Sequence, residues 1–340
     1  MKRGGFLLVM LGAFFLAMAP LTRFYIADRV IAAPLDFGKN LTLKASEASY
    51  FDASKNLTGK VVSGKELEAR LNVGGDVKSG TDELMVLNGI LQLYSGEHAI
   101  SLNEFRLAFD RRTGMLRNAA DSNVDRDTEV VQSGYWMMLP VGNVHKETYQ
   151  LFDLVTGRTW PARFSGVEEV EGIAAYRFEQ HVEPTMVGRS KKTVAPTVVG
   201  LPETAKPVKI DRYYEAKNTL WIDPRTGMPI KIQQNVNSTL RTEKGDEGAF
   251  VLADLVLQDE DVKDLAKMSE EYAGKIDLVR TTLPAIALAA GLVLLAGGGV
   301  LSLVSGTRPA GRGRRSSSGQ KVEQVPVGSR DPLAGAVKHK

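Results

Sequence analysis

The chain contains no cysteine and only four histidines among its 340 residues. The lack of cysteine excludes a disulfide framework and any thiolate metal site. The histidines are scattered and form no His-Glu-x-x-His or other paired motif. A Gly-x-Ser-x-Gly elbow and a phosphate-binding P-loop are also missing. These absences predict a protein that is not an enzyme and that uses no cofactor and no metal.

Acidic charge is scarce at both ends of the chain. Lys2 and Arg3 begin it, and residues 306–340 carry eight basic side chains against two acidic ones. The net charge of the whole chain is only +3, so the residues between the ends are acidic on balance. A nucleic-acid-binding body would be basic, and no nucleic-acid partner is expected.

Two long stretches lack charge almost completely. Residues 6–21, extended by Phe24, Tyr25 and Ile26, and residues 283–304 are each long enough to cross a bilayer. The first stretch also fits a cleaved signal peptide, because 17–19 reads Ala-Met-Ala. The apolar run continues beyond that site, which favours an uncleaved anchor.

Basic residues concentrate on the cytoplasmic side of membrane helices. The charge pattern therefore predicts a two-pass plasma-membrane protein with both termini in the cytoplasm and the acidic middle outside. The tail is rich in Gly, Ser and Arg and is expected to be disordered, with contact to anionic lipids or phosphorylation at 316–318 as alternative roles.

Alternating apolar and polar residues recur through the middle of the chain, as at 91–94, 105–109 and 230–233. This period of two predicts a mainly β domain with an antiparallel sheet. Residues 65–71 are the one candidate for a short helix within it. The four prolines of residues 183–209 predict a long irregular loop.

The motif Asp-x-x-Thr-Gly occurs three times, each time after an apolar residue. The aspartate can accept backbone amide hydrogen bonds, and the glycine can take a positive φ, so each copy predicts a tight turn between strands. A set of catalytic or calcium-binding carboxylates is the alternative. The turn residues are Asp110 with Gly114, Asp153 with Gly157, and Asp223 with Gly227.

The first and third copies, FDRRTGM and IDPRTGM, lie 113 residues apart. This spacing suggests two similar β units and predicts tandem curved sheets or half-barrels. Apolar residues at steps of three and four from Val262 to Val279 add an amphipathic stalk helix. The expected organisation is a cytoplasmic start (1–5), a membrane helix (6–26), an extracytoplasmic β domain (27–258, units 27–145 and 146–258), the stalk (259–282), a second membrane helix (283–304) and the tail (305–340).

An apolar aromatic stretch at 135–142 reads YWMMLPVG. Adjacent methionines beside a tryptophan adapt to irregular shapes and suit an apolar pocket. A core strand is the alternative. The candidate lining residues of a pocket for an acyl chain are Tyr135, Trp136, Met137, Met138 and Leu139.

Residues 149–178, and the segment TLWIDPRTGMPIKI at 219–232, resemble an actinobacterial membrane-protein family known as the porin-A family. The shorter segment is also similar to a hairpin of half-barrel lipoprotein carriers. A member of the family is linked to the maturation of lipomannan and lipoarabinomannan, and its outer domain to lipid binding. The resemblance therefore implies a role in the cell envelope.

These observations predict a membrane-anchored protein that binds a phospholipid or lipoglycan outside the plasma membrane. It would assist envelope assembly without covalent chemistry. One alternative is a scaffold for envelope enzymes such as glycosyltransferases. The other is a channel component, although a bilayer-spanning barrel needs no helical anchors.

Overall fold

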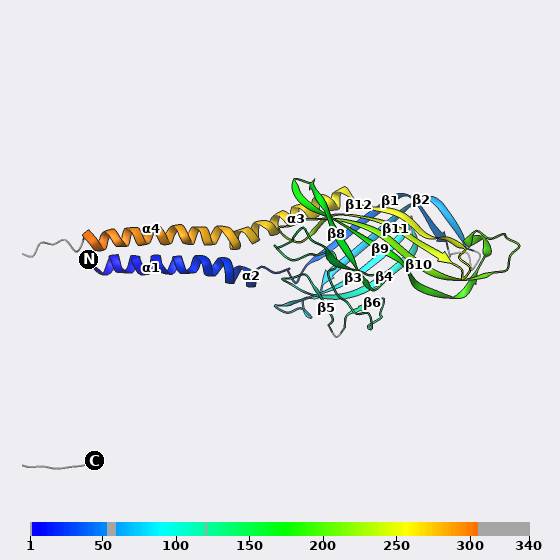
Figure 1. The fold of residues 1–340 in the computed structure, drawn as a ribbon, viewed down its shortest axis with the longest axis horizontal. Helices are drawn as coiled ribbons and strands as arrows, with labels where there is room; N and C mark the ends of the chain where they lie inside the picture. Colours follow the sequence, from blue (N-terminus) through cyan, green and yellow to red (C-terminus); the bar gives the residue numbers. More distant parts are fainter. Residues whose placement is uncertain (1, 53–58, 120, 305–340) are drawn as a thin grey trace, which may run out of the picture.

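The protein consists of an elongated β domain with two long helices extending from one end (Figure 1). The structure, a computed structural model, describes residues 2–52, 59–119 and 121–304. The expected disordered tail lies outside these residues.

Twelve strands form one curled antiparallel half-barrel sheet in the order β5-β4-β3-β2-β1-β12-β11-β10-β9-β8-β7, with β6 beside β4. The long strands alternate buried and exposed residues, which explains the period of two in the sequence. The strands are β1 (Gly38–Asp52), β2 (Lys60–Gly75), β3 (Leu84–Ser95), β4 (His98–Asp110), β5 (Leu116–Arg117), β6 (Asn123–Val124), β7 (Tyr149–Asp153), β8 (Arg158–Val170), β9 (Ile173–Val194), β10 (Val208–Ile222), β11 (Pro229–Arg241) and β12 (Glu247–Leu257).

The two halves of the chain occupy the two halves of the sheet. Strands β1 to β6 come first, β7 to β12 second, and the halves join where β1 pairs with β12. The free edges are linked by a short irregular segment: Leu116 N donates to Gly134 O over 2.8 Å, and Tyr135 N donates to Gln150 O over 2.8 Å. The irregular segment therefore connects the two edges of the curled sheet at this point.

Two predictions of local structure are wrong. Residues 65–71 lie in β2 and not in a helix, because Leu67, Ala69 and Leu71 alternate into the core. Residues 183–194 belong to β9, and only the short 3-10 helix η2 (Pro196–Val199) and its flanks form the expected loop. The proline at 184 is tolerated because it lies at a register shift between β9 and β10.

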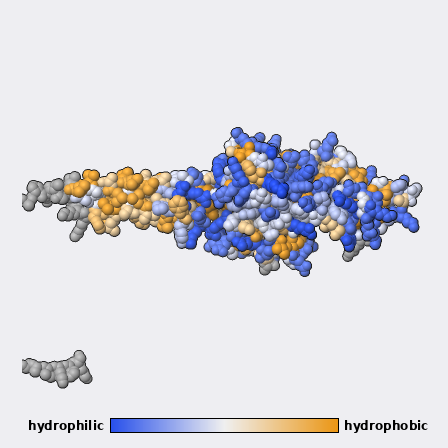
Figure 2. Space-filling view, in the orientation of Figure 1, coloured by the Kyte–Doolittle hydropathy of each residue, from blue (hydrophilic) through white to orange (hydrophobic). Residues whose placement is uncertain are grey.

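Each long helix contains a π-helical turn near the β domain. The first runs through α1 (Lys2–Leu21), η1 (Thr22–Ile26) and α2 (Ala27–Val30), and the second through α3 (Asp259–Asp277), η3 (Leu278–Thr282) and α4 (Leu283–Val304). Residues 4–30 and 259–303 contain stretches apolar enough to cross a membrane. Figure 2 shows apolar surface along these helices, whereas the β domain is mostly hydrophilic.

Glycines allow α1 and α4 to pack closely. A Cβ atom at Gly12 would lie 2.9 Å from Gly291 O, and one at Gly298 would lie 2.8 Å from Gly5 O. The two glycines on each helix are seven residues apart, so they recur on one face. Small residues of this kind let helices approach within a membrane, where apolar surface alone gives no drive to associate.

Candidate functional site

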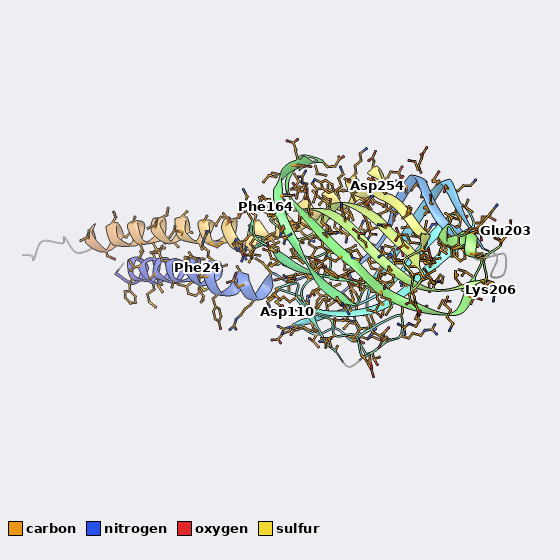
Figure 3. All side chains as sticks on the ribbon, turned by 45° about the vertical axis from the view of Figure 1, so that its right-hand side comes forward. Phe24, Asp110, Phe164, Glu203, Lys206 and Asp254 are labelled. Carbon is orange, nitrogen blue, oxygen red and sulfur yellow. The ribbon has the colours of Figure 1, made fainter. Side chains whose placement is uncertain are left out.

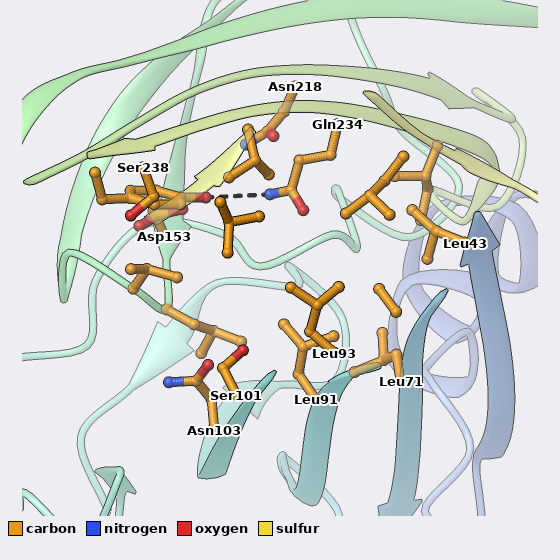
Figure 4. Close-up of a pocket in the computed structure, with 18 of the residues that line it drawn as sticks. Leu43, Leu71, Leu91, Leu93, Ser101, Asn103, Asp153, Asn218, Gln234 and Ser238 are labelled. Atoms are coloured by element: carbon orange, nitrogen blue, oxygen red, sulfur yellow. Dashed lines mark hydrogen bonds between the residues drawn. The ribbon is translucent and has the colours of Figure 1, made fainter. Parts of the chain in front are cut away.

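The concave side of the sheet contains an apolar cavity of about 150 Å³. Both halves of the sheet line it, and Figure 4 shows leucines from β1, β2 and β3 gathered at one end. These are Leu43, Leu71, Leu91 and Leu93. An engineered cavity of similar size takes up a benzene-sized molecule, so this space suits one short hydrocarbon segment.

The opposite end of the cavity is polar. In Figure 4, Asp153 and Ser238 lie away from Leu43 and Leu71. Strand β10 contributes polar residues here because alternate side chains of a strand share one face. The polar lining includes Asp153, Gln180, Arg212, Tyr214, Asn218, Gln234 and Ser238.

Asp153 is buried and forms no salt bridge with a cation within the described residues. Its Oδ1 accepts hydrogen bonds from Thr156 N over 2.7 Å and from Thr156 Oγ1 over 2.8 Å. Burial nevertheless raises the pKa of this carboxyl, because the charged form loses its hydration. The carboxyl also interacts with the hydroxyl of Tyr214, whose pKa is raised well above its usual value by burial and by Asp153.

Arg212 is a part-buried cation that also lines the polar end of the cavity. Its guanidinium lies 4.3 Å from the ring centre of Phe250, and its Nε donates to Ser238 Oγ over 3.4 Å. Within the described residues, it has no carboxylate close enough for a salt bridge. Burial lowers the pKa of Arg212, although arginine stays protonated at neutral pH. An anionic ligand group would supply the missing counter-charge.

Amide side chains extend the polar end. Asn218 Nδ2 donates to Gln180 Oε1 over 2.7 Å, and Gln180 Nε2 donates to Leu151 O over 2.9 Å. Asn218 Oδ1 is buried without a hydrogen-bond partner in the described part of the chain. A buried acceptor without a partner is unfavourable, so a ligand hydroxyl or ammonium donor would stabilise this end.

The structure distributes the predicted aromatic stretch over three places. Trp136 and Met137 line the cavity, and Tyr135 and Leu139 pack in a neighbouring apolar cluster. Met138 lines a separate pocket near the helices. The stretch forms no strand, only isolated bridges at Tyr135, so the alternative of a core strand is wrong.

The three Asp-x-x-Thr-Gly motifs connect β4 to β5, β7 to β8 and β10 to β11. In each, the aspartate carbonyl accepts the amide of the glycine over 2.8 to 2.9 Å. The glycines have φ of 74°, 63° and 79°, the region that favours glycine. They are Gly114, Gly157 and Gly227.

Two of these turns hold the aromatic stretch in place. A Cβ atom at Gly114 would lie 3.1 Å from Leu139 O, and one at Gly227 would lie 2.3 Å from the same oxygen. Leu139 N donates to Gly227 O over 2.9 Å, and Val141 N donates to Arg112 O over 3.2 Å. The matching turns therefore fix the segment that forms one wall of the cavity.

The polar residues of β10 were missed at the sequence level. Arg212, Tyr214, Asn218 and Leu220 share the face that lines the cavity. Their spacing of two or four residues signals a strand, but an arginine or asparagine on it is normally assigned to the solvent side. Only the curled sheet shows that this face points inward.

A curled antiparallel sheet carried on two long apolar helices defines a β-domain protein associated with membranes. The model of one protein family, described as Porin PorA, matches residues 4–300. The chain therefore belongs to the PorA porin family, as the resemblance indicated. No curated protein matches its sequence.

Proposed function

We propose that this protein binds a phospholipid or lipoglycan in the cavity of its β domain and performs no covalent chemistry. The observation that carries the proposal is one cavity with an apolar end and a polar end. Hydrocarbon would lie among the leucines, and each buried methylene would contribute about 0.8 kcal/mol. The phosphate of an anionic lipid would pair with Arg212, and a headgroup hydroxyl would donate to Asn218.

The two apolar helices support the same function by location. As transmembrane anchors they hold the β domain at the outer surface of the plasma membrane, where acyl chains are available. The bound lipid would serve envelope assembly, with lipoglycan synthesis as the process implied by the family resemblance. Glycosyltransferases of that process are the proposed protein partners.

The experiment is native mass spectrometry of the full-length protein released from membranes, followed by organic extraction and lipid identification. We expect about one lipid per chain. Ala69→Phe fills the cavity, because Ala69 is buried and lines it, and the retained lipid should fall at least tenfold. Ala99→Phe, the same substitution at an exposed site on β4, is the matched control. A folded wild-type protein that carries no lipid and rejects added lipid would refute the function.

The family description favours channel formation as a second candidate. The mainly hydrophilic surface of the β domain in Figure 2 is unlike the apolar belt of a bilayer-spanning barrel. A channel would therefore have to form between helices of several copies. Single-channel recording from planar bilayers tests this. If the wild type and Ala69→Phe show the same conductance, the pore is separate from the cavity.

A further inference from the structure

A second apolar pocket lies at the base of the β domain, between that domain and the helices. Its volume is about 190 Å³, and we call it the basal pocket. Val30, at the end of the first helical stretch, lines it together with Val279 in η3. Val279 precedes the start of α4 by only four residues, so the pocket lies beside the top of both proposed membrane spans.

The aromatic stretch borders both the basal pocket and the cavity. Met137 lines the cavity, whereas the adjacent Met138 lines the basal pocket. Methionine side chains are unbranched and flexible, and they adapt to the shape of an apolar neighbour. The wall between the two spaces is therefore one chain thick here and contains movable side chains.

The backbone of this wall is strained. Met137 has φ of 55°, and Met138 N donates to Trp136 O over 2.5 Å, which closes a three-residue turn. A turn of this kind with positive φ is rare for a residue with a side chain and is unfavourable. The neighbouring residues keep it in place, because Leu139 N is bonded to Gly227 O.

The second helix is bonded to the same segment. Arg280 in η3 donates from Nη1 to Gly142 O over 2.6 Å and from Nη2 to Asp28 Oδ1 over 3.4 Å. One arginine thus joins both helical stretches to the loop that continues from the wall. The basal pocket is consequently fixed relative to both helical stretches.

We propose that the basal pocket binds an acyl chain of a bilayer lipid and that this chain passes the Trp136–Met138 wall to reach the cavity. The occupant follows from the site: the lining is mainly apolar, and each proposed span ends four residues from it. Lys275 lies at its edge and makes no ion pair within the described residues, so it can pair with a lipid phosphate. Neither space alone exceeds the size of a short hydrocarbon segment, whereas the two in sequence accommodate a longer chain.

This inference rests on the proposed lipid function, so its test separates the two. The chain contains no cysteine, and a single introduced cysteine can be labelled uniquely. Ala32→Cys places bimane in the basal pocket of the full-length protein, and Ala99→Cys places it on exposed β4 as the control. Both are reconstituted in nanodiscs of phosphatidylcholine with one fifth phosphatidylglycerol, whose acyl chains are brominated.

We expect at least twofold stronger quenching of bimane at Ala32→Cys than at Ala99→Cys. In the second arm, protein stripped of lipid is alkylated with a bulky maleimide, returned to the same nanodiscs and re-extracted for native mass spectrometry. Alkylated Ala32→Cys should retain at least tenfold less lipid than the same variant left unalkylated. Alkylation of Ala99→Cys should change nothing.

Equal quenching at both positions overturns the basal site. Unchanged lipid loading after alkylation at Ala32→Cys overturns the route through the wall. A third result distinguishes the two proposals. If bimane at Ala32→Cys is strongly quenched but the unmodified protein retains no lipid, the cavity function is overturned and the basal site stands. Met138→Ala thins the wall, and the amount of lipid loaded at short times should rise; no rise would contradict passage through the wall.

Discussion

The three motif aspartates have the same turn geometry but different surroundings. Burial raises the pKa of Asp110, but hydrogen bonds from Thr113 and Arg112 outweigh this effect, and the pKa lies below its usual value. Asp223 is fully buried and pairs with Arg225 and with Ser269 of α3. Of the three, only Asp153 lines the cavity, and no cation of the described residues is close enough to form a salt bridge with it.

Asp153 should make stability depend on pH in the opposite direction from an ordinary paired carboxylate. Burial raises the pKa of Asp153 in the folded protein above the usual value of an aspartate, so the folded protein binds the proton more tightly than the unfolded chain. Stability from this group is complete below the unfolded pKa and decreases as pH rises through the folded pKa. Between these two pKa values, each pH unit costs about 1.4 kcal/mol.

Asp153→Asn removes that titration and keeps an oxygen for the Thr156 amide. We expect the variant to match the wild type near pH 3 and to be more stable than it at pH 7. Urea unfolding of full-length protein in detergent, followed by tryptophan fluorescence across this pH range, measures the difference. Parallel pH profiles for the two proteins would contradict the assignment.

Gly227 combines a positive φ with a close backbone contact, and Gly227→Ala should lower the free energy of unfolding by more than about 3 kcal/mol. Gly64 is the matched control, because its φ is 65° but a Cβ atom there would meet nothing within 4 Å. Gly64→Ala should cost about 1 kcal/mol. Equal losses in urea unfolding would show that contact with Leu139 contributes nothing.

At the scale of elements, the packing of α1 on α4 can be tested by cross-linking. A Cβ atom at Gly5 would lie 2.6 Å from Ser302 Oγ, so the side chains of Gly5→Cys and Ser302→Cys would be in direct contact. Oxidation in membranes should close an intramolecular bond in most molecules, seen as a mobility shift on non-reducing gels. Gly4→Cys with Ser302→Cys is the control, because a Cβ atom at Gly4 would meet no other part of the described chain within 4 Å. Equal cross-linking of both pairs would contradict the helix register.

The sequence predicts elements well where one physical signal dominates. The mainly β class and the two apolar helices followed from period-two alternation and from uncharged length. The helix prediction for residues 65–71 was wrong because Lys, Glu, Ala and Leu favour helices in isolation. In the fold, pairing of β2 with β1 and β3 decides the structure of this segment. The link between the two sheet edges through Tyr135 could not be predicted, because it depends on backbone hydrogen bonds between segments that have no sequence pattern of their own.

The candidate site was predictable only in part, because it too depends on contacts between segments that are distant in the sequence. Trp136 and Met137 were found from local composition and line the cavity. Arg212 and Asn218 became recognisable only when the sheet curled and turned their face inward. A site assembled from four or more strands has no single segment whose spacing could reveal it.

For the whole molecule, the proposed lipid site requires the β domain to lie outside the plasma membrane. Charge at the chain ends predicts this orientation, with both termini in the cytoplasm. Figure 3 shows Glu203 and Lys206 at the end of the domain away from the helices, so a label there reports on the domain alone. Glu203→Cys in intact cells should react with a membrane-impermeant maleimide.

Ser317→Cys in the tail gives the comparison, because that residue follows the second span in the sequence. It should react only after the membrane is permeabilised, since the tail is predicted to be cytoplasmic. Labelling of both positions in intact cells would mean that the second span does not cross the bilayer. Protection of Glu203→Cys would place the cavity in the cytoplasm, where an outer-envelope lipid cannot reach it, and the proposed function would then fail together with the orientation.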